Sequence, residues 1–244
     1  MSAGSTDSDD PDVGTSEWYG LDQFELDFMY EYDTSLNARV DINWLSGDKV
    51  DLEQAFFTYS MGNGFSITAG RFLSAIGWEA AEPVDMYQYS YGTSVKYPGY
   101  HNGIALGYDT EMFGLYGSII DDIWAEDTVG DAEELGYELQ LSLTPIEGFT
   151  TKIQYASQDK GAYDKDLFNV WASYEIGSLL LAAEYDSYDG WNAPGVDGDG
   201  WLVMGNYGFT DNLGLTLRYS VTVSYTHLRA HETSLHLVCR LLLE

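Results

Sequence analysis

The chain has 244 residues, with 40 acidic side chains against 10 basic ones and a formal net charge of -30. This balance excludes a nucleic-acid-binding protein, because such a protein needs a basic face that neutralises phosphates. A hydrophobic content of 45% is too high for a disordered acidic chain. The single cysteine excludes a disulfide framework, and no apolar run reaches the roughly 18 residues of a transmembrane helix.

The first twenty residues form a polar lead. Met1 to Asp12 are small, polar and acidic, which predicts a loop or a disordered segment. A charged segment followed by an apolar core is absent, so no signal peptide is expected. We expect residues 1–20 to belong to an outer loop.

Side chains alternate between apolar and polar from Leu21 to Asp33, where Phe24, Leu26 and Phe28 interleave with Glu25 and Asp27. Successive side chains of a strand point to opposite faces, so this pattern predicts a strand with one apolar and one acidic face. After the short break at Thr34 and Ser35 the alternation returns from Leu36 to Trp44. Two such runs around a two-residue break predict a hairpin.

The same unit recurs five times, which gives about twelve strands in six hairpins. The further predicted pairs are Asp51 to Ser60 with Phe65 to Phe72, His101 to Tyr108 with Phe113 to Ile120, Leu135 to Thr144 with Phe149 to Gln158, Leu167 to Glu175 with Leu179 to Tyr188, and Trp201 to Phe209 with Leu213 to Ser220. Short turns inside the hairpins alternate with mostly longer links between them. This alternation is typical of outer-membrane barrels. The predicted fold is therefore all-β, an antiparallel up-and-down transmembrane β-barrel.

The number of strands decides which way the apolar faces point. About eight strands can fill a barrel with side chains, whereas twelve or more cannot, so the apolar faces must point outward into lipid. Aromatic residues on these faces gather at both strand ends, as membrane interfaces favour. The predicted interface aromatics are Tyr32, Trp44, Tyr59, Tyr108, Tyr155, Tyr174, Tyr185 and Tyr219.

Topology suggests that strands are missing at both ends. The first strand runs toward a short turn and the twelfth runs away from one, so a closed barrel with both termini on the turn side needs further strands. We expect residues 21–223 to be part of a barrel with 14 or more strands.

The last segment, residues 224–244, differs from the rest. It contains His227, His231, His236 and Cys239, glycine is absent and the alternation stops. The segment resembles translated sequencing-adapter DNA, which predicts a non-native tail. The alternative is a short amphipathic helix carrying a His/Cys metal site.

A group of short motifs carries a family resemblance. They are Gly70-Arg71-Phe72, Ile76 to Glu79, Tyr87 to Ser90, Pro98, and His101-Asn102-Gly103. Through these motifs the sequence resembles Gram-negative outer-membrane porins and is most similar to the OmpL-like β-barrel porin-2 family. The resemblance in motif extends from Gly70 to Trp124. The resemblance implies a pore in the bacterial outer membrane, surrounded by the lipid bilayer, through which small hydrophilic solutes pass passively.

The faces expected to line the lumen are mainly acidic. The predicted pore-lining residues are Glu25, Asp27, Glu31, Asp33, Arg39, Asp41, Glu138, Lys152, Glu175, Glu184, Asp186 and Arg218. Rings of Asp or Glu favour cations, so we expect the pore to prefer cations. The alternative is that the acidity reflects a salty habitat and solubility, with no selective role.

The link from Leu73 to Tyr100 is long for a connection without structure of its own. Tyr87, Tyr89, Tyr91 and Tyr97 are the residues expected to narrow the lumen if this loop folds inward. The alternative is a solvated outer loop.

Signals for chemistry are weak. No nucleophile elbow, zinc-protease motif or phosphate loop occurs, so we predict no enzyme, no catalytic residue, no cofactor and no metal site. His101 is predicted to be a rim residue. The acidic link from Asp121 to Glu134 and the turn with Asp197 and Asp199 are predicted to be solvated loops, and the alternative is that either binds calcium. A homo-oligomer is compatible with the sequence, which contains no sign of one. The alternative function is a soluble, secreted all-β module that binds carbohydrate or another ligand.

Overall fold

A computed structural model gives the fold of the chain, and every element among the residues that it describes is a β-strand. The structure describes residues 2–6, 16–20, 23–45, 49–79, 86–87, 98–123, 135–190, 194–210, 213–226 and 232–243. Among these residues, no helix is long and apolar enough to cross a membrane.

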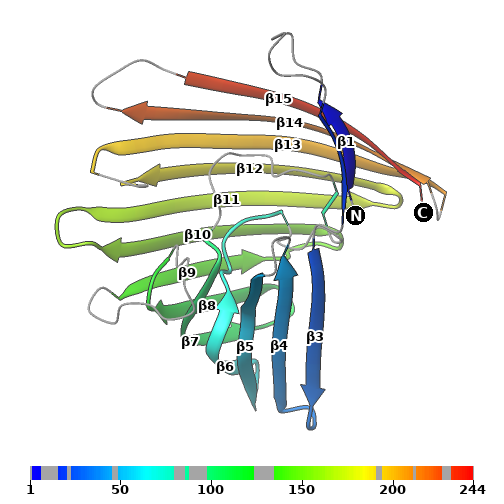
Figure 1. Ribbon diagram of the computed structural model, residues 1–244. Coiled ribbons are helices and arrows are strands. Elements are labelled where there is room, and N and C mark those ends of the chain that lie inside the picture. The colour runs from blue at the N-terminus through cyan, green and yellow to red at the C-terminus, as the bar shows by residue number, and fades with distance from the viewer. Residues whose placement is uncertain are drawn as a thin grey trace.

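Thirteen strands form one antiparallel sheet in which each strand pairs with its neighbours in sequence (Figure 1). They are β3 (Gln23–Glu31), β4 (Leu36–Leu45), β5 (Lys49–Gly62), β6 (Phe65–Leu73), β7 (Tyr100–Asp109), β8 (Phe113–Ile120), β9 (Gly136–Leu143), β10 (Phe149–Asp159), β11 (Asp164–Ile176), β12 (Leu179–Asp189), β13 (Val196–Thr210), β14 (Leu213–Thr226) and β15 (Glu232–Leu243). The up-and-down topology is the predicted one, and the six predicted hairpins correspond to β3 through β14.

The tight turns have the backbone that their residues predict. Gly62, Asn63 and Gly64 all adopt positive φ, at 84°, 53° and 85°. Glycine and asparagine tolerate this region better than other residues. At Gly64 a side chain would also collide with the backbone carbonyl of Asp109. The β5–β6 connection therefore requires glycine there.

Both chain ends contain strands that were not predicted, while the outer-loop assignment of residues 1–20 and the non-native origin of residues 224–244 stay predictions. The polar lead contains β1 (Ser2–Thr6) and β2 (Ser16–Gly20), which pair with each other in a separate two-stranded sheet. Residues 232–243 form β15, which pairs with β14. Backbone pairing requires an extended partner and a free strand edge, which β14 offers, and does not require an alternating sequence.

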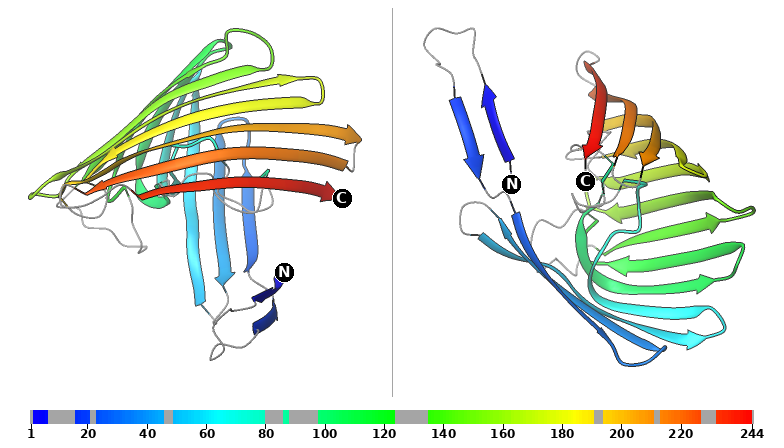
Figure 2. Two further views of the ribbon diagram at one scale, coloured as in Figure 1. Left: turned by 90° about the horizontal axis from the view of Figure 1, so that it is seen from above. Right: turned by 90° about the vertical axis from the view of Figure 1, so that its right-hand side faces the viewer.

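The large sheet is strongly curved, with a concave and a convex face (Figure 2). It is open, with β3 and β15 as its two edges. Residues 74–79, which follow β6, lie against the concave face, where Ser74, Gly77 and Trp78 bond side chains of β9, β10 and β12 (Figure 1). Ile76 of this segment packs into a small apolar cluster with residues of the wall, which include Phe72, Ile120, Leu167 and Tyr188.

The two faces of the sheet have opposite polarity. Phe24, Leu26 and Phe28 are 50%, 45% and 57% exposed on the convex face. Asp41 and Glu138 are fully buried on the concave face. A soluble protein would bury the first set and expose the second. The predicted register, with apolar residues outward and carboxylates inward, is therefore the observed one.

Candidate functional site

The concave face is a wall of polar side chains drawn from many strands. Asp41 and Gln54 come from β4 and β5, Glu138 and Gln154 from β9 and β10, and Arg218 from β14, and all of them are buried. They share one face because inward positions repeat every second residue in each antiparallel strand. The candidate site is this wall together with the segment that crosses it, Ser74 to Glu79, which we call the crossing segment.

The crossing segment is first held by Glu138 on β9. The Ser74 hydroxyl donates a hydrogen bond to Glu138 Oε1, and the Ala75 backbone N–H donates to Glu138 Oε2 over 3.3 Å. The segment then moves on to β10, where the Gly77 N–H donates to Gln154 Oε1 at 3.2 Å. Backbone groups that a loop would otherwise leave unpaired are thus satisfied by side chains of the wall.

The far end of the crossing segment reaches β12 and β14. The Trp78 N–H donates to Glu184 Oε1 at 2.9 Å. Glu79 forms an ion pair with Arg218, with 2.6 Å between Oε1 and Nη1, and both side chains are 1% exposed. Two buried charges are tolerated when they pair directly. The crossing segment therefore spans the wall from β9 to β14 and is anchored at each step.

Asn169 connects Glu184 to a further carboxyl-bearing residue of the wall, Asp186. Asn169 donates from Nδ2 to Glu184 Oε1 at 2.7 Å and to Asp186 Oδ1 at 2.5 Å. Asp186 is fully buried and Glu184 is 4% exposed. The three predicted pore-lining residues Glu184, Asp186 and Arg218 are thus brought together, in contact with or next to the crossing segment.

An aromatic pair connects the crossing segment to Tyr87, a later residue of the same link. The rings of Trp78 and Tyr87 stack with centroids 5.8 Å apart and planes 12° from parallel. Burial raises the pKa of the Tyr87 hydroxyl, and the charge of Glu175 raises it further. Tyr87 and Glu175 also line a recess of 360 Å³ with Asn206. The other predicted narrowing residues, Tyr89, Tyr91 and Tyr97, lie outside the described residues.

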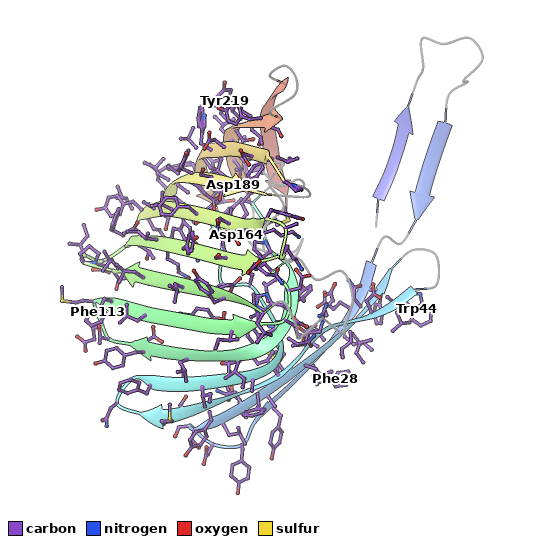
Figure 3. All side chains as sticks on the ribbon, turned by 90° about the vertical axis from the view of Figure 1, so that its left-hand side faces the viewer. Phe28, Trp44, Phe113, Asp164, Asp189 and Tyr219 are labelled. Carbon is purple, nitrogen blue, oxygen red and sulfur yellow. The ribbon has the colours of Figure 1, made fainter. Side chains whose placement is uncertain are left out.

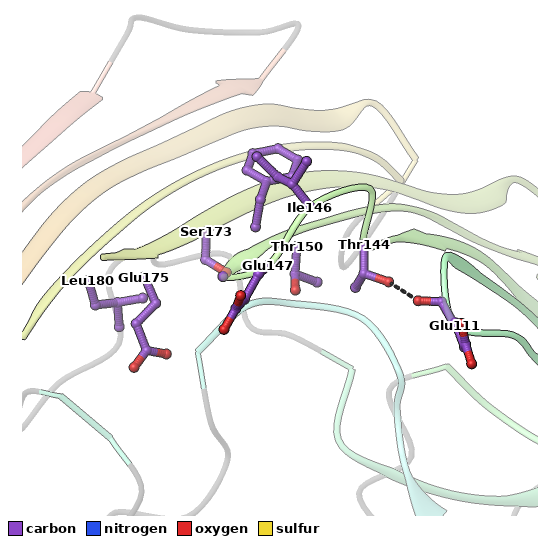
Figure 4. Close-up of a pocket in the computed structure, with 10 residues that line it drawn as sticks. Glu111, Thr144, Ile146, Glu147, Thr150, Ser173, Glu175 and Leu180 are labelled. Carbon is purple, nitrogen blue, oxygen red and sulfur yellow. Dashed lines mark hydrogen bonds between the residues drawn. The ribbon is translucent and has the colours of Figure 1, made fainter. Parts of the chain in front are cut away.

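A second recess of 420 Å³ lies at the end of the sheet that carries the short turns (Figure 4). Its walls include Glu111, Glu147 and Glu175. The Thr144 hydroxyl donates to the backbone carbonyl of Glu111 at 3.0 Å and joins two of the turns. This recess carries three carboxylates, and one of them, that of Glu175, was predicted to line the pore.

The acidic residues at the β3–β4 edge fall into two groups. Glu25, Asp27 and Asp41 lie together, and Arg39 donates from Nε to both Asp41 oxygens at 2.8 and 2.7 Å. Glu31 is exposed at the end of β3.

Asp33, which was predicted to line the lumen, lies instead in the exposed β3–β4 turn. Its carboxylate accepts hydrogen bonds from Ser35, including one from the backbone N–H at 2.7 Å. These bonds hold the pKa of Asp33 below its ordinary value.

Each predicted basic residue of the wall has a partner. Arg39 and Arg218 pair with carboxylates, and Lys152 lies over the ring of Trp171, 5.5 Å from its centroid. A ring face attracts a cation, although more weakly than a carboxylate does. The positive charges of these three residues are therefore committed to nearby partners.

The prediction that His101 is a rim residue is wrong. His101 is fully buried on β7, with its ring edge-on to Phe72 at 5.0 Å and its Nε2 3.9 Å from Glu138 Oε2. His101 is the second residue of β7. The strand next to it, β6, leads directly into the crossing segment. The burial of His101 could not be inferred from its position in the sequence.

The beginning of the acidic link is ordered by hydrogen bonds. Asp121 accepts from the Asn102 backbone N–H at 2.9 Å and from Asn102 Nδ2 at 2.6 Å. Burial raises the pKa of Asp121, but these hydrogen bonds and one from Asp122 outweigh it and lower that pKa below its ordinary value. Residues 124–134 of this link lie outside the described residues.

The predicted interface aromatics lie on the convex face, in two groups at opposite strand ends. Near the short turns, Tyr108 contacts Phe65 with ring centroids 4.5 Å apart, and Tyr174 contacts Phe149 at 6.2 Å. Toward the other end, Tyr219 contacts Trp201 at 5.2 Å. Figure 3 shows Phe28, Phe113, Trp44 and Tyr219 distributed around this outer surface. The other members of the predicted set on this face are Tyr32, Tyr59, Tyr155 and Tyr185.

Sequence reasoning missed the residues that connect loop and wall. Ser74, Glu79 and Asn169 were not predicted to belong to the site. The run from Ile76 to Glu79 is one of the motifs that carry the family resemblance, and this was the one signal that pointed to the crossing segment.

An antiparallel sheet with apolar residues outside, polar residues inside and a segment anchored across its hollow defines an outer-membrane β-barrel porin. Comparison with known families identifies the particular group. The chain belongs to the beta-barrel porin-2, OmpL-like family, whose family model matches residues 19–224. No curated protein matches the sequence.

Solved structures show the same fold. OmpT of Vibrio cholerae superposes with a TM-score of 0.62 at 17% identity, over 94% of this chain and 76% of OmpT. OmpF of Salmonella typhi, solved in complex with daunomycin, gives 0.65 at 14% identity, over 87% of this chain and 74% of OmpF. The outer-membrane channel DcaP of Acinetobacter baumannii gives 0.58 at 15% identity, over 83% of this chain and 66% of DcaP.

Proposed function

We propose that the concave face lines a water-filled channel through which small hydrophilic solutes diffuse passively across the bacterial outer membrane, with a preference for cations. The observation that carries the cation preference is the state of the wall's charges. The basic residues Arg39, Lys152 and Arg218 each have a partner. The carboxylates of Glu111, Glu147 and Glu175 line the recess at the short-turn end of the sheet. The surplus charge that a passing ion meets is negative.

The narrowness of a channel strengthens this effect. Charges at an open surface are screened within about 8–10 Å at ordinary salt, and low-dielectric walls focus the field along a narrow passage. Carboxylate rings then raise the local concentration of cations. Because the screening length falls to about 3 Å at 1 M salt, the preference should weaken as salt rises.

Reversal potentials in planar bilayers test this preference. The wild-type protein should show a cation-selective reversal potential in a KCl gradient, and Glu147→Gln combined with Glu175→Gln should reduce it. Asp199 on the convex face bonds Tyr185, so Asp199→Asn removes one charge away from the lumen and serves as the control. Anion preference in the wild type, or an equal effect of the control, would refute the proposal.

The crossing segment is also proposed to narrow the lumen. Its support is the series of anchors from Glu138 to Arg218, which hold the segment on the inner wall and away from the outer surface. Replacing residues 74–99 with a short glycine linker should raise the single-channel conductance. A conductance equal to that of the wild type, in a protein that still inserts, would contradict this role.

A further inference from the structure

A row of three residues crosses the concave face at the end of the sheet that carries the short turns. Glu175 on β11 lies directly opposite Leu180 on β12, and Leu180 lies directly opposite Asn206 on β13. All three line a recess of 360 Å³, and Tyr87 from the link after β6 lines it as well. The recess therefore combines a carboxylate, an aliphatic side chain, an amide and an aromatic ring.

The size of this recess suits an organic molecule. Neighbouring strands lie about 4.8 Å apart, so a row across three strands is about 10 Å long. Pockets for small organic molecules have volumes of about 300–1,000 Å³, whereas one water molecule takes about 30 Å³. A bare metal ion would leave most of the recess, including its apolar part at Leu180, without a contact.

The aromatic ring of Tyr87 is held in place by the crossing segment. It stacks on Trp78 with centroids 5.8 Å apart and planes 12° from parallel, and the Trp78 N–H donates to Glu184 on the wall at 2.9 Å. Tyr87 is 37% exposed and lines the recess. A ring fixed in this way loses little freedom when a solute binds, and ring faces attract cations.

The carboxylate of Glu175 is available to a solute. The residue is exposed, and no described residue forms a hydrogen bond or an ion pair with its carboxylate. Burial raises the pKa of the Tyr87 hydroxyl and the charge of Glu175 raises it further, which indicates that the two side chains lie near each other. Glu175 also lines the adjoining recess of 420 Å³, together with Glu147 (Figure 4).

We propose that the recess at Tyr87 and Glu175 binds organic ammonium ions, which are solutes with a protonated amine and a flat apolar body. The amine donates a charge-assisted hydrogen bond to the Glu175 carboxylate, and the body contacts the Tyr87 ring and Leu180. This inference rests on the proposed function and deepens it, because it names the class of cation that the lumen binds.

Isothermal titration calorimetry with benzylammonium chloride tests the site on the chain refolded in detergent. The heat of the same titration into empty micelles is subtracted, and one saturable site per chain is expected. Benzyl alcohol has the ring without the charge, and ammonium chloride has the charge without the ring. Each should bind about tenfold more weakly or less, because each loses one of the two contacts. If either binds as tightly as benzylammonium, the proposal is wrong.

Glu175→Gln tests the contact with the amine. It should weaken benzylammonium binding about tenfold or more, because a charge-assisted hydrogen bond becomes a neutral one. Glu111→Gln is the matched control, since it makes the same chemical change at a residue that lines only the adjoining recess. An equal loss in both variants would mean that the ligand responds to the general charge of this end of the sheet, and it would overturn the site.

Tyr87→Leu tests the contact with the ring. It should weaken benzylammonium binding about three- to tenfold, because the aromatic face is lost, whereas Tyr87→Phe retains that face and should bind nearly as the wild type does. Tyr32→Leu makes the same change on the convex face and should leave binding unchanged. Equal affinities of Tyr87→Leu and Tyr32→Leu would contradict the role of the ring.

Reversal potentials in a KCl gradient separate this inference from the proposed function. A wild type that binds benzylammonium but prefers anions would contradict only the proposed function. A cation-selective wild type without saturable binding would contradict only the binding site. The heat-dependent shift in gel mobility shows whether each variant is folded, and if Tyr87→Leu is not, Glu175→Gln and its control decide.

Discussion

At the scale of single residues, the buried pair of Glu79 and Arg218 is the strongest link between the crossing segment and the wall. Both side chains are 1% exposed and 2.6 Å apart. Taking two charges out of water is costly, and the pair is stable only while both partners are present. Loss of one partner leaves a buried charge without compensation.

Arg218→Gln should therefore destabilise the protein by about 3–5 kcal/mol, as breaking a buried pair typically does. Denaturant unfolding in lipid vesicles, followed by tryptophan fluorescence, measures the change. Glu79→Gln in the same chain should restore much of the loss, because no charge then stays unpaired. A single variant as stable as the wild type, or a double variant no better than the single, would count against the pair's role.

Residue identities on the wall were predictable where they follow the strand period. Glu138, Glu184 and Arg218 were placed inward because each alternates with apolar neighbours. The partners of these residues were not predictable. Ser74 contacts Glu138 across 64 positions, and Glu79 contacts Arg218 across 139. No local pattern records contacts between segments so far apart.

At the scale of elements, each strand presents one face to lipid and one to the hollow. On β9, Leu139 is 53% exposed on the convex face, whereas its neighbour Gln140 accepts a hydrogen bond from Gln154 on the concave side. These adjacent positions differ in environment and share the same strand. They form a matched pair for testing which face meets the membrane.

Leu139→Arg should cost about 2–4 kcal/mol, because a charge at the centre of a lipid-facing strand meets hydrocarbon. Gln140→Arg should cost about 1 kcal/mol, the worth of the lost hydrogen bond, since its charge meets water. Folding titrations into vesicles give both values. The reverse order of the two costs would mean that the sheet is turned the other way.

The elements themselves were largely readable from the sequence. Alternation placed β3 through β14, because one face of each strand must be apolar when it meets lipid. β15 and the β1–β2 pair were missed for different reasons. β1 and β2 have only five residues each and no clear alternation. In β15, Leu235 and Leu237 do alternate with polar residues, but the segment had been set aside as a tail.

At the scale of the whole molecule, the exposed apolar side chains of the convex face decide how the protein must be handled. Phe24, Leu106 and Leu139 are 50%, 57% and 53% exposed and belong to different strands. Such a surface is too extensive for a protein dissolved in water. Lipid or detergent is the environment that accepts it.

The refolded protein should stay in solution in detergent and precipitate when the detergent is removed. Without heating it should migrate on a denaturing gel as a compact band, and boiling should shift the band to the position of the unfolded chain. A soluble binding module would stay in solution without detergent. That result would overturn the assignment of the convex face to lipid.

The anchoring of the crossing segment has a consequence for the order in which the chain acquires its structure. Its contacts begin on β9 and end on β14, so they cannot form until those strands have paired. Contacts that close long stretches of chain carry a larger entropic penalty and form slowly. The crossing segment is synthesised early but must dock late. We therefore expect its docking onto the concave face to be among the last steps of folding.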